Sequence, residues 1–318
     1  MVLLVQRFAK LHSKLENYHH HHHHYDHHQA EADNISAPLR VFRSEISSLV
    51  TKLSLNWKQE DGLENLSLEW IQKCFHVLPM INKAFGKLVM EIDYHMSKWK
   101  AKTSEEYFKY SLNLLDFLNS FSSSMSYLAQ AKLSLSHTLS LVKTSPSLAR
   151  ERLKAIEFKN PRKEFKFQEY KEAEEERSCL DKEWVILQAL MELRSVGFWV
   201  CSVLFGGLCG DAKGFLEMRK LAGNLSNPAL IKLDSIILEV VMKKGCVLKE
   251  VKELNDAAAS LAAAIASGNS RNAAEELQTR LGMIGKLLDS LTKEVDCLFN
   301  EVLVGRNDLL NGIRSTKP

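Results

Sequence analysis

Apolar residues recur at alternating steps of four and three over long stretches of this chain, which is the spacing of a helix packed along one side. The C-terminal row contains Leu277, Leu281, Ile284, Leu288, Leu291, Val295, Leu298, Val302, Gly305 and Leu309. A second row contains Leu233, Ile237, Val240, Lys244, Val247, Val251, Leu254, Ala258, Leu261 and Ile265, with Lys244 as its only polar member. The turn signal Ser267-Gly268-Asn269 separates the rows, so the pattern predicts an antiparallel helical hairpin. It closes either within the chain as a bundle or in part between chains, and the first is favoured because other helices with apolar faces are present to cover the rows.

The same spacing predicts further helices upstream, and most are long because the chain has only 14 Gly and 6 Pro. A first helix begins near Pro38, and a second runs from about Leu68 to Trp99 with a kink at Pro79. The next runs from Ser104 to Val142 and opens on a Thr103–Glu106 capping box. Shorter helices are predicted over Ser147–Phe158 and near Phe215–Leu221, and the row that contains Leu233 begins at Pro228 behind a Ser226-Asn227 cap.

These helices predict an all-α fold, an elongated antiparallel bundle of long helices with a C-terminal helical hairpin. With 45% hydrophobic and 25% charged residues, residues 36–318 are expected to fold as a single helical-bundle domain. Residues 1–35 are expected to be disordered because they hold the His-rich tract His19–His28, which cannot build a core. Near residues 159–177 the chain turns basic and then acidic, which predicts an exposed charged linker.

The segment 195–210 is apolar, rich in glycine and free of charge, and Arg194 and Asp211 bracket it. Sixteen residues fall short of the roughly 20 that span a bilayer. Two interpretations stay open, a buried helix at a close helix contact and a segment that enters a membrane. In the first, five large side chains pack in the core, and in the second they face outward: Phe198, Trp199, Val203, Leu204 and Phe205.

Signatures of catalysis, cofactor binding and metal binding are missing from the sequence. It contains no nucleophile elbow, Walker A loop, dinucleotide fingerprint, zincin motif or EF-hand. Of the histidines in the body, His76, His95 and His137 each lack the Glu three residues earlier that di-iron bundles use. The six cysteines are scattered, which favours reduced thiols, and the net charge of +3 argues against nucleic acid as a partner. We therefore expect a non-enzymatic protein with no cofactor and no metal.

The C-terminal string Lys293-Glu294-Val295-Asp296-Cys297-Leu298-Phe299, followed by Gly305-Arg306, Leu309-Leu310 and Ile313-Arg314, resembles the plant BYPASS family. The helix opening Ser67-Leu68-Glu69-Trp70, the sequence Lys159-Asn160-Pro161 and the glycine-rich segment that ends near Gly210 are similar as well. The resemblance covers roughly residues 38–314, and its most specific part is the C-terminal string.

The resemblance implies a plant developmental regulator or adaptor without catalytic residues. The founding member of the family restrains a root-derived mobile signal that affects shoot and root growth. The implied partners are other proteins bound through helix faces, exocyst subunits among them, with membrane contact as a further option. One alternative is a membrane-associated component of secretory, exocyst-linked trafficking, and another is a carrier or enzyme for an apolar metabolite. The expected location is the cytoplasm or the cytosolic face of the endoplasmic reticulum membrane, with the plastid left open.

Overall fold

The computed structural model describes residues 36–55, 57, 66–156, 181–210, 212–244 and 248–315, and all regular structure in these ranges is helical. The first helix covers residues 36–55. It is followed by α2 (Leu68–Phe75), α3 (Val77–Glu91), the short 3₁₀ helix η1 (Met96–Lys98), α4 (Ala101–Leu141), α5 (Pro146–Arg152), α6 (Lys182–Cys209), α7 (Ala212–Leu221), α8 (Pro228–Lys244), α9 (Lys249–Ser267) and α10 (Arg271–Ser315). The prediction of an all-α bundle of long helices is confirmed. The His-rich tract and the charged linker lie outside the described residues.

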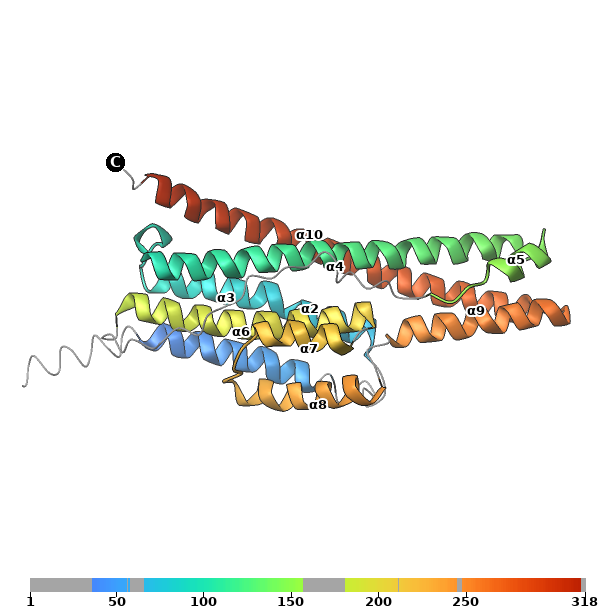
Figure 1. Ribbon diagram of the computed structural model, residues 1–318, viewed down its shortest axis with the longest axis horizontal. Helices are drawn as coiled ribbons and strands as arrows, with labels where there is room; N and C mark the ends of the chain where they lie inside the picture. The colour runs from blue at the N-terminus through green and yellow to red at the C-terminus, as the bar shows by residue number, and fades with distance from the viewer. Residues whose placement is uncertain are drawn as a thin grey trace, which may run out of the picture.

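The molecule is elongated and divides into a thick body and a thinner arm (Figure 1). Helices α4 and α10, of 41 and 45 residues, lie against each other and link the two parts. The body holds the first helix, α2, α3, α6, α7 and α8 beside the N-terminal half of α4. The arm consists of residues 122–156 and 249–288, which are the C-terminal half of α4, α5, α9 and the start of α10. The buried apolar residues of the arm continue the hydrophobic core of the body.

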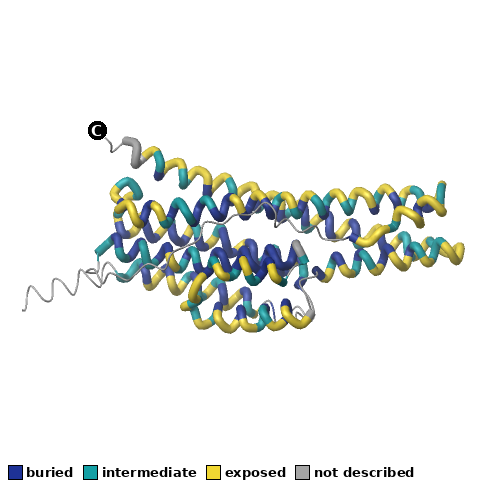
Figure 2. Tube along the Cα trace, viewed as in Figure 1, coloured by how far each residue is buried: buried dark blue, intermediate teal, exposed yellow. Residues whose placement is uncertain are grey.

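Helix α6 forms the centre of the body, because α2, α3, α4, α7 and α8 all pack against it. Its side chains are buried along most of its length, unlike the striped helices of the arm (Figure 2). The helix begins at Asp181, whose carboxylate accepts the backbone N–H of Trp184, and ends at Gly210 in the left-handed conformation with φ 63°. A helix that is apolar on every side is stable in water only when neighbours cover it all round.

The predicted C-terminal hairpin is confirmed by α9 and α10, which pack against each other in the arm. Gly268 closes α9 at φ 77°, and its N–H bonds to the carbonyl oxygens of Ala264 and Ile265. The α10 row is buried at every apolar side-chain position from Leu277 to Leu309. The C-terminal half of α10 continues past α9 along α4 (Figure 1). Helix α4 therefore covers the part of the α10 apolar row that α9 does not reach.

The predicted single helix from Pro228 to Ile265 is wrong, because the structure divides it into α8 and α9. Helix α8 ends at Lys244, the one polar member of its apolar row. Lysine followed by glycine is a common signal for the end of a helix. The prediction missed it because the apolar spacing continues across these residues. Helix α8 lies beside the body, whereas α9 runs out along the arm (Figure 1). The Ser226-Asn227 cap is confirmed in part, since the Asn227 side chain accepts the N–H groups of Ala229 and Leu230.

The predicted helix from Leu68 to Trp99 is also divided. Helices α2 and α3 meet at His76, three residues before Pro79, and α3 ends at Glu91. Proline has no N–H for the carbonyl four residues earlier, here that of Phe75, so the break lies on its N-terminal side. The helix predicted over Ser147–Phe158 is shorter and covers only Pro146–Arg152.

The long helix predicted over Ser104–Val142 is present as α4, but the Thr103–Glu106 capping box that should open it is wrong. The N-cap residue is Lys100, which makes no side-chain capping bond. Thr103 instead donates its hydroxyl hydrogen to Glu183 of α6. Tertiary contact has thus replaced the local capping interaction.

Gly207 of α6 marks the closest approach between α6 and α2. A Cβ at this position would lie 2.8 Å from Ile71 Cδ1 and 3.5 Å from Leu248 Cδ2. Because Ile71 and Leu248 are themselves fully buried, we expect Gly207→Val to lower the free energy of unfolding by about 1–3 kcal/mol through overpacking. Chemical denaturation measures this, and Gly282→Val, where a Cβ meets no atom within 4 Å, is the control that keeps wild-type packing.

Candidate functional site

The five side chains that the sequence singled out in residues 195–210 all lie inside the protein. Phe198, Trp199, Val203 and Leu204 are 0% exposed and Phe205 is 7% exposed. Within the described residues, α6 is the one helix long and apolar enough to cross a membrane, but 83% of its most apolar window is buried in the protein. In this structure the segment packs the core of the body.

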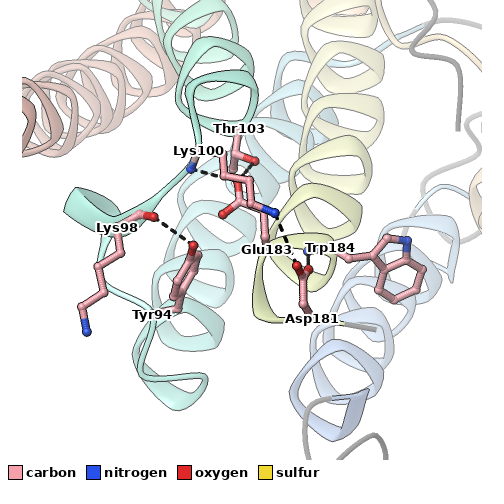
Figure 3. A network of polar contacts seen from close by, with 7 residues as sticks. All are labelled: Tyr94, Lys98, Lys100, Thr103, Asp181, Glu183 and Trp184. Atoms are coloured by element: carbon pink, nitrogen blue, oxygen red, sulfur yellow. Dashed lines mark hydrogen bonds and ion pairs between the residues drawn. The ribbon is translucent and has the colours of Figure 1, made fainter. Parts of the chain in front are cut away.

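A polar network joins the N-terminal ends of α4 and α6 at one end of the body (Figure 3). The Glu183 carboxylate, only 7% exposed, accepts the backbone N–H of Lys100 at 3.1 Å and the hydroxyl of Thr103. Beside it, Lys100 Nζ lies 3.4 Å from Asp181 Oδ2. The Glu183 carboxylate therefore accepts one backbone amide and one hydroxyl at the N-terminus of a neighbouring helix, where the helix dipole favours negative charge.

Tyr94 completes this network by donating its hydroxyl hydrogen to the carbonyl oxygen of Lys98 at 2.9 Å. Burial raises the Tyr94 pKa to about 12, and the nearby Glu183 and Asp181 carboxylates add to the shift. The phenol is therefore protonated at neutral pH and serves as a donor. It holds the turn between α3 and α4 and has no property of a general base.

A second buried network joins α6, α7 and α8 around Asp234, which is 4% exposed. Asp234 Oδ1 accepts the indole N–H of Trp199 at 3.0 Å and Arg219 Nε–H at 2.7 Å, and Oδ2 pairs with the other edge of the same guanidinium. Both carboxylate oxygens are therefore used. The bidentate pair fixes α7 and α8 against the core helix.

A third carboxylate, the half-buried Glu250 of α9, reaches back to the start of α2. Its Oε2 accepts the backbone N–H of Leu68 at 2.7 Å, and Lys249 N–H donates to the carbonyl of Leu66 at 2.9 Å. Burial raises the pKa of Glu250 above its ordinary value, more than these amide contacts lower it. The contact ties the arm to the body at the point where α9 begins.

This raised pKa has a predictable effect on stability. A carboxyl group with a higher pKa in the folded state binds its proton more tightly there, so folded protein loses stability as pH rises from the unfolded pKa, about 4.3, through the raised folded value. We expect Glu250→Gln to remove this loss while keeping an acceptor for Leu68 N–H. The measurement is the free energy of unfolding of both proteins between pH 4 and pH 8. A constant difference across that range would contradict the prediction.

The three acidic networks are structural in geometry, since Glu183 and Glu250 each accept a hydrogen bond at the start of another helix, and Asp234 accepts hydrogen bonds from an indole and a guanidinium. Among the described residues, no group of three or more His, Cys, Asp or Glu side chains is arranged to hold a metal ion. Burial raises the pKa values of Cys74 and Cys201, which keeps both thiols protonated. The described part of the fold thus defines an all-α bundle with structural polar junctions.

The string Lys293–Phe299 lies on α10 and divides between two faces of that helix. On the inner face, Val295 and Leu298 are buried, and Glu294 Oε1 accepts a hydrogen bond from Gln72 Nε2 of α2 at 2.6 Å. On the outer face, Lys293, Asp296 and Cys297 are exposed. Cys297 Sγ lies 3.6 Å from Glu301, whose charge raises the pKa of that thiol. The outer-face side chains contribute nothing to the core.

The following residues of the string, Gly305 and Arg306, dock α10 onto α4. A Cβ at Gly305 would lie 2.9 Å from the Tyr107 hydroxyl, so glycine allows the close approach. Arg306 lies over the Phe108 ring, 5.0 Å from its centroid, and donates to the Phe108 carbonyl at 2.8 Å and to Ser111 Oγ at 2.9 Å. These two residues therefore have a packing role.

Comparison with known proteins agrees with the resemblance carried by this string. The chain is 25% identical over 298 residues to Protein BPS1, chloroplastic, of Arabidopsis thaliana, covering 87% of this chain and 84% of that protein. It is 25% identical over 283 residues to UPF0496 protein 4 of Oryza sativa subsp. indica, covering 74% of this chain and 61% of the rice protein, less than two thirds of its length. No family model and no solved structure gives a significant match. The chain is a distant homologue of plant BPS1 and UPF0496 proteins, the BYPASS family.

Sequence reasoning missed Glu183 and Asp234 as buried groups and Glu250 as a half-buried one. A signal existed for Asp234, because it lies at helical spacing between Leu230 and Ile237, which are both buried. For Glu183 and Glu250, which come early in their helices, exposure was the ordinary expectation. Their burial depends on which helix end happens to lie opposite, and only the tertiary structure supplies that.

Proposed function

We propose that this protein is a non-catalytic developmental regulator that binds partner proteins through the outer face of α10 and restrains a mobile growth signal. The distant homology to the BYPASS family supports the developmental role. The observation that carries the choice of face is the division of the family-like string, in which Lys293, Asp296 and Cys297 face solvent and serve no packing contact in the body. Where a family-like string contains exposed residues, a binding role explains those residues better than a role in packing the fold.

The geometry of α10 supports a protein partner. The exposed residues lie on a continuous 45-residue helix that α4, α2 and α9 hold rigidly from the other side. Val304, 58% exposed, lies two turns beyond Cys297 and adds apolar surface next to the charged positions. A rigid helix face with mixed charged and apolar positions is a common mode of recognition between helices. Exocyst subunits are the partner class to examine first.

A charge swap tests this proposal. The variant Lys293→Glu/Asp296→Lys keeps the net charge and leaves the buried face of α10 intact. Its matched control, Lys286→Glu/Asp289→Lys, makes the same exchange exactly one heptad earlier on the same helix, at residues that are equally exposed. Each variant is expressed in a plant whose own copy of the gene is disrupted. We expect the control to restore shoot and root growth and the string variant to fail, with loss of co-purified partner proteins.

Growth restored equally by both variants would overturn the role of this face.

The alternative of a carrier or enzyme for an apolar metabolite has its own readout, native mass spectrometry of the protein purified from plant tissue. A stoichiometric small apolar molecule would favour that alternative over the adaptor. The proposed location is the cytoplasm or the cytosolic face of the endoplasmic reticulum, and a fluorescent fusion separates this from the plastid named for the Arabidopsis relative.

A further inference from the structure

The arm carries more basic than acidic residues, with ten Lys or Arg and six Asp or Glu in residues 122–156 and 249–288. Residues 117–156, which form most of α4's outer half and α5, contain five Lys or Arg and a single acid, Glu151. In residues 249–288 of α9 and α10, five basic residues are balanced by five acidic ones, among them Glu275, which pairs with Arg271. The chain as a whole is nearly balanced, with 42 basic and 39 acidic residues. The positive charge is therefore concentrated on the arm.

Four of these cations form what we call the basic patch: Lys143, Arg150, Arg152 and Lys154. All four are exposed, and within the described residues none of them makes an ion pair or a side-chain hydrogen bond. This is unlike Arg280 and Arg271 on α10, which pair with Glu276 and Glu275. Unpaired surface cations gathered at one place give a positive local potential that attracts anions.

The patch is held rigidly although α5 is short. Ala149 is fully buried where α5 packs against α4 and α9. Just past α5, the Asn255 side chain of α9 makes two hydrogen bonds to the backbone of Ile156. It accepts the Ile156 N–H at 2.7 Å and donates to the Ile156 carbonyl at 3.2 Å. Arg150, Arg152 and Lys154 lie between these two anchors and are thus displayed on an ordered backbone, and Lys143 precedes them in the turn from α4 to α5. Helix α5 lies at the outer end of the arm (Figure 1).

Apolar side chains accompany the cations. Leu148 is 37% exposed, and it shares a face of α5 with Arg152 because the two residues are four apart. Leu133 on α4 is 65% exposed. The outer surface also carries exposed hydroxyl groups, such as those of Ser140 and Ser147. Lysine, arginine and hydroxyl groups beside leucine are the composition that binds at the interface of an anionic bilayer.

We propose that the tip of the arm docks on an anionic phospholipid surface through the basic patch, with Leu148 entering the headgroup region. Charge complementarity favours an anionic partner, and the exposed leucines favour lipid over nucleic acid. Nucleic-acid surfaces are commonly bound by basic residues interleaved with aromatic side chains, whereas Tyr127 is the only aromatic residue between Ser122 and Ile156. The proposal places membrane contact at the arm and leaves the buried α6 segment in the core. It does not depend on the proposed protein-binding face of α10.

The test is flotation of the full-length protein with vesicles of phosphatidylcholine alone and with 30% phosphatidylserine, at about 0.1 M and 0.5 M salt, which bracket strong and weak screening. The tip variant is Lys143→Glu/Arg150→Glu/Arg152→Glu. Its control, Lys83→Glu/Lys220→Glu/Lys232→Glu, makes the same change in net charge at exposed lysines of the body. A second variant, Leu148→Ser, removes the apolar contact alone.

We expect wild type and control to float with the anionic vesicles at low salt and not with neutral ones. Each cation near such a surface contributes a factor of roughly five, so the tip variant should lose about 100-fold in partition coefficient. Leu148→Ser should lose severalfold. Three results would overturn the proposal: no flotation of wild type, equal losses in the tip and body variants, or patch-dependent binding to an oligonucleotide with no binding to vesicles.

Discussion

Leu204→Asp is expected to prevent folding of the body. Leu204 is 0% exposed in the C-terminal quarter of α6. The substitution forfeits about 2–5 kcal/mol of apolar burial and places a carboxylate at a fully buried position, where charge is costly. The combined loss is about 5 kcal/mol or more, which equals the whole stability of many domains. Soluble yield and circular dichroism of the purified variant measure the effect.

The control for this substitution is Leu55→Asp, because Leu55 is 54% exposed at the end of the first helix. It should leave yield and melting temperature close to wild type. The same pair discriminates the two interpretations of residues 195–210. If the segment were a membrane anchor, Leu204→Asp would yield a folded protein released from membranes by alkaline carbonate. A folded, soluble Leu204→Asp variant would therefore contradict the packing seen here.

Asp234→Ala is expected to cost about 3–5 kcal/mol in the free energy of unfolding. The substitution leaves the Arg219 guanidinium partly buried without its counter-ion and the Trp199 indole N–H without an acceptor. An arginine side chain stays charged at any pH at which the protein is folded, so in the variant the guanidinium cannot relieve the loss by deprotonation. Urea denaturation followed by tryptophan fluorescence measures the change, with Trp199 itself as a reporter.

Two further variants separate the loss of an interaction from the exposure of its partner. The double variant Asp234→Leu/Arg219→Leu removes both charges and should be less destabilised than Asp234→Ala alone, since no unpaired charge remains. Asp256→Ala, at an exposed aspartate of α9, should change stability by less than about 0.5 kcal/mol. A double variant as unstable as Asp234→Ala would show that packing volume, and not the charge pair, dominates at this junction.

The helix breaks show how far a periodic pattern can be trusted. The apolar row of α10 predicted a long, buried helix face, and every apolar side chain in it is buried. The row from Leu233 to Ile265 is equally regular, yet it belongs to two helices that pack in different parts of the molecule. Periodicity measures whether a residue faces a core, and it does not say whether two consecutive segments face the same core. Local stop signals such as Lys244-Gly245 and Pro79 carry that information more weakly.

The candidate site divides in the same way. The sequence singled out the apolar segment of α6 and the string on α10, and both are prominent in the fold. The burial of Phe198 and Trp199 could not be predicted from the sequence, because an apolar helix is compatible with lipid and with a protein core alike. It depends on the packing of α2, α3, α4, α7 and α8 against α6. The basic patch likewise depends on α5 being folded back against α4 and α9.

The sequence by itself determined the all-α class, the long helices, the C-terminal hairpin and the resemblance to the BYPASS family, because these follow from local spacing and from a contiguous string of residues. Tertiary structure alone decided that α8 and α9 separate, that Glu183 and Glu250 cap helices distant in the chain, and that Asp234 joins Trp199 and Arg219. These contacts join residues from 15 to 182 positions apart. Their energies depend on burial and on opposing partners, which no local pattern encodes.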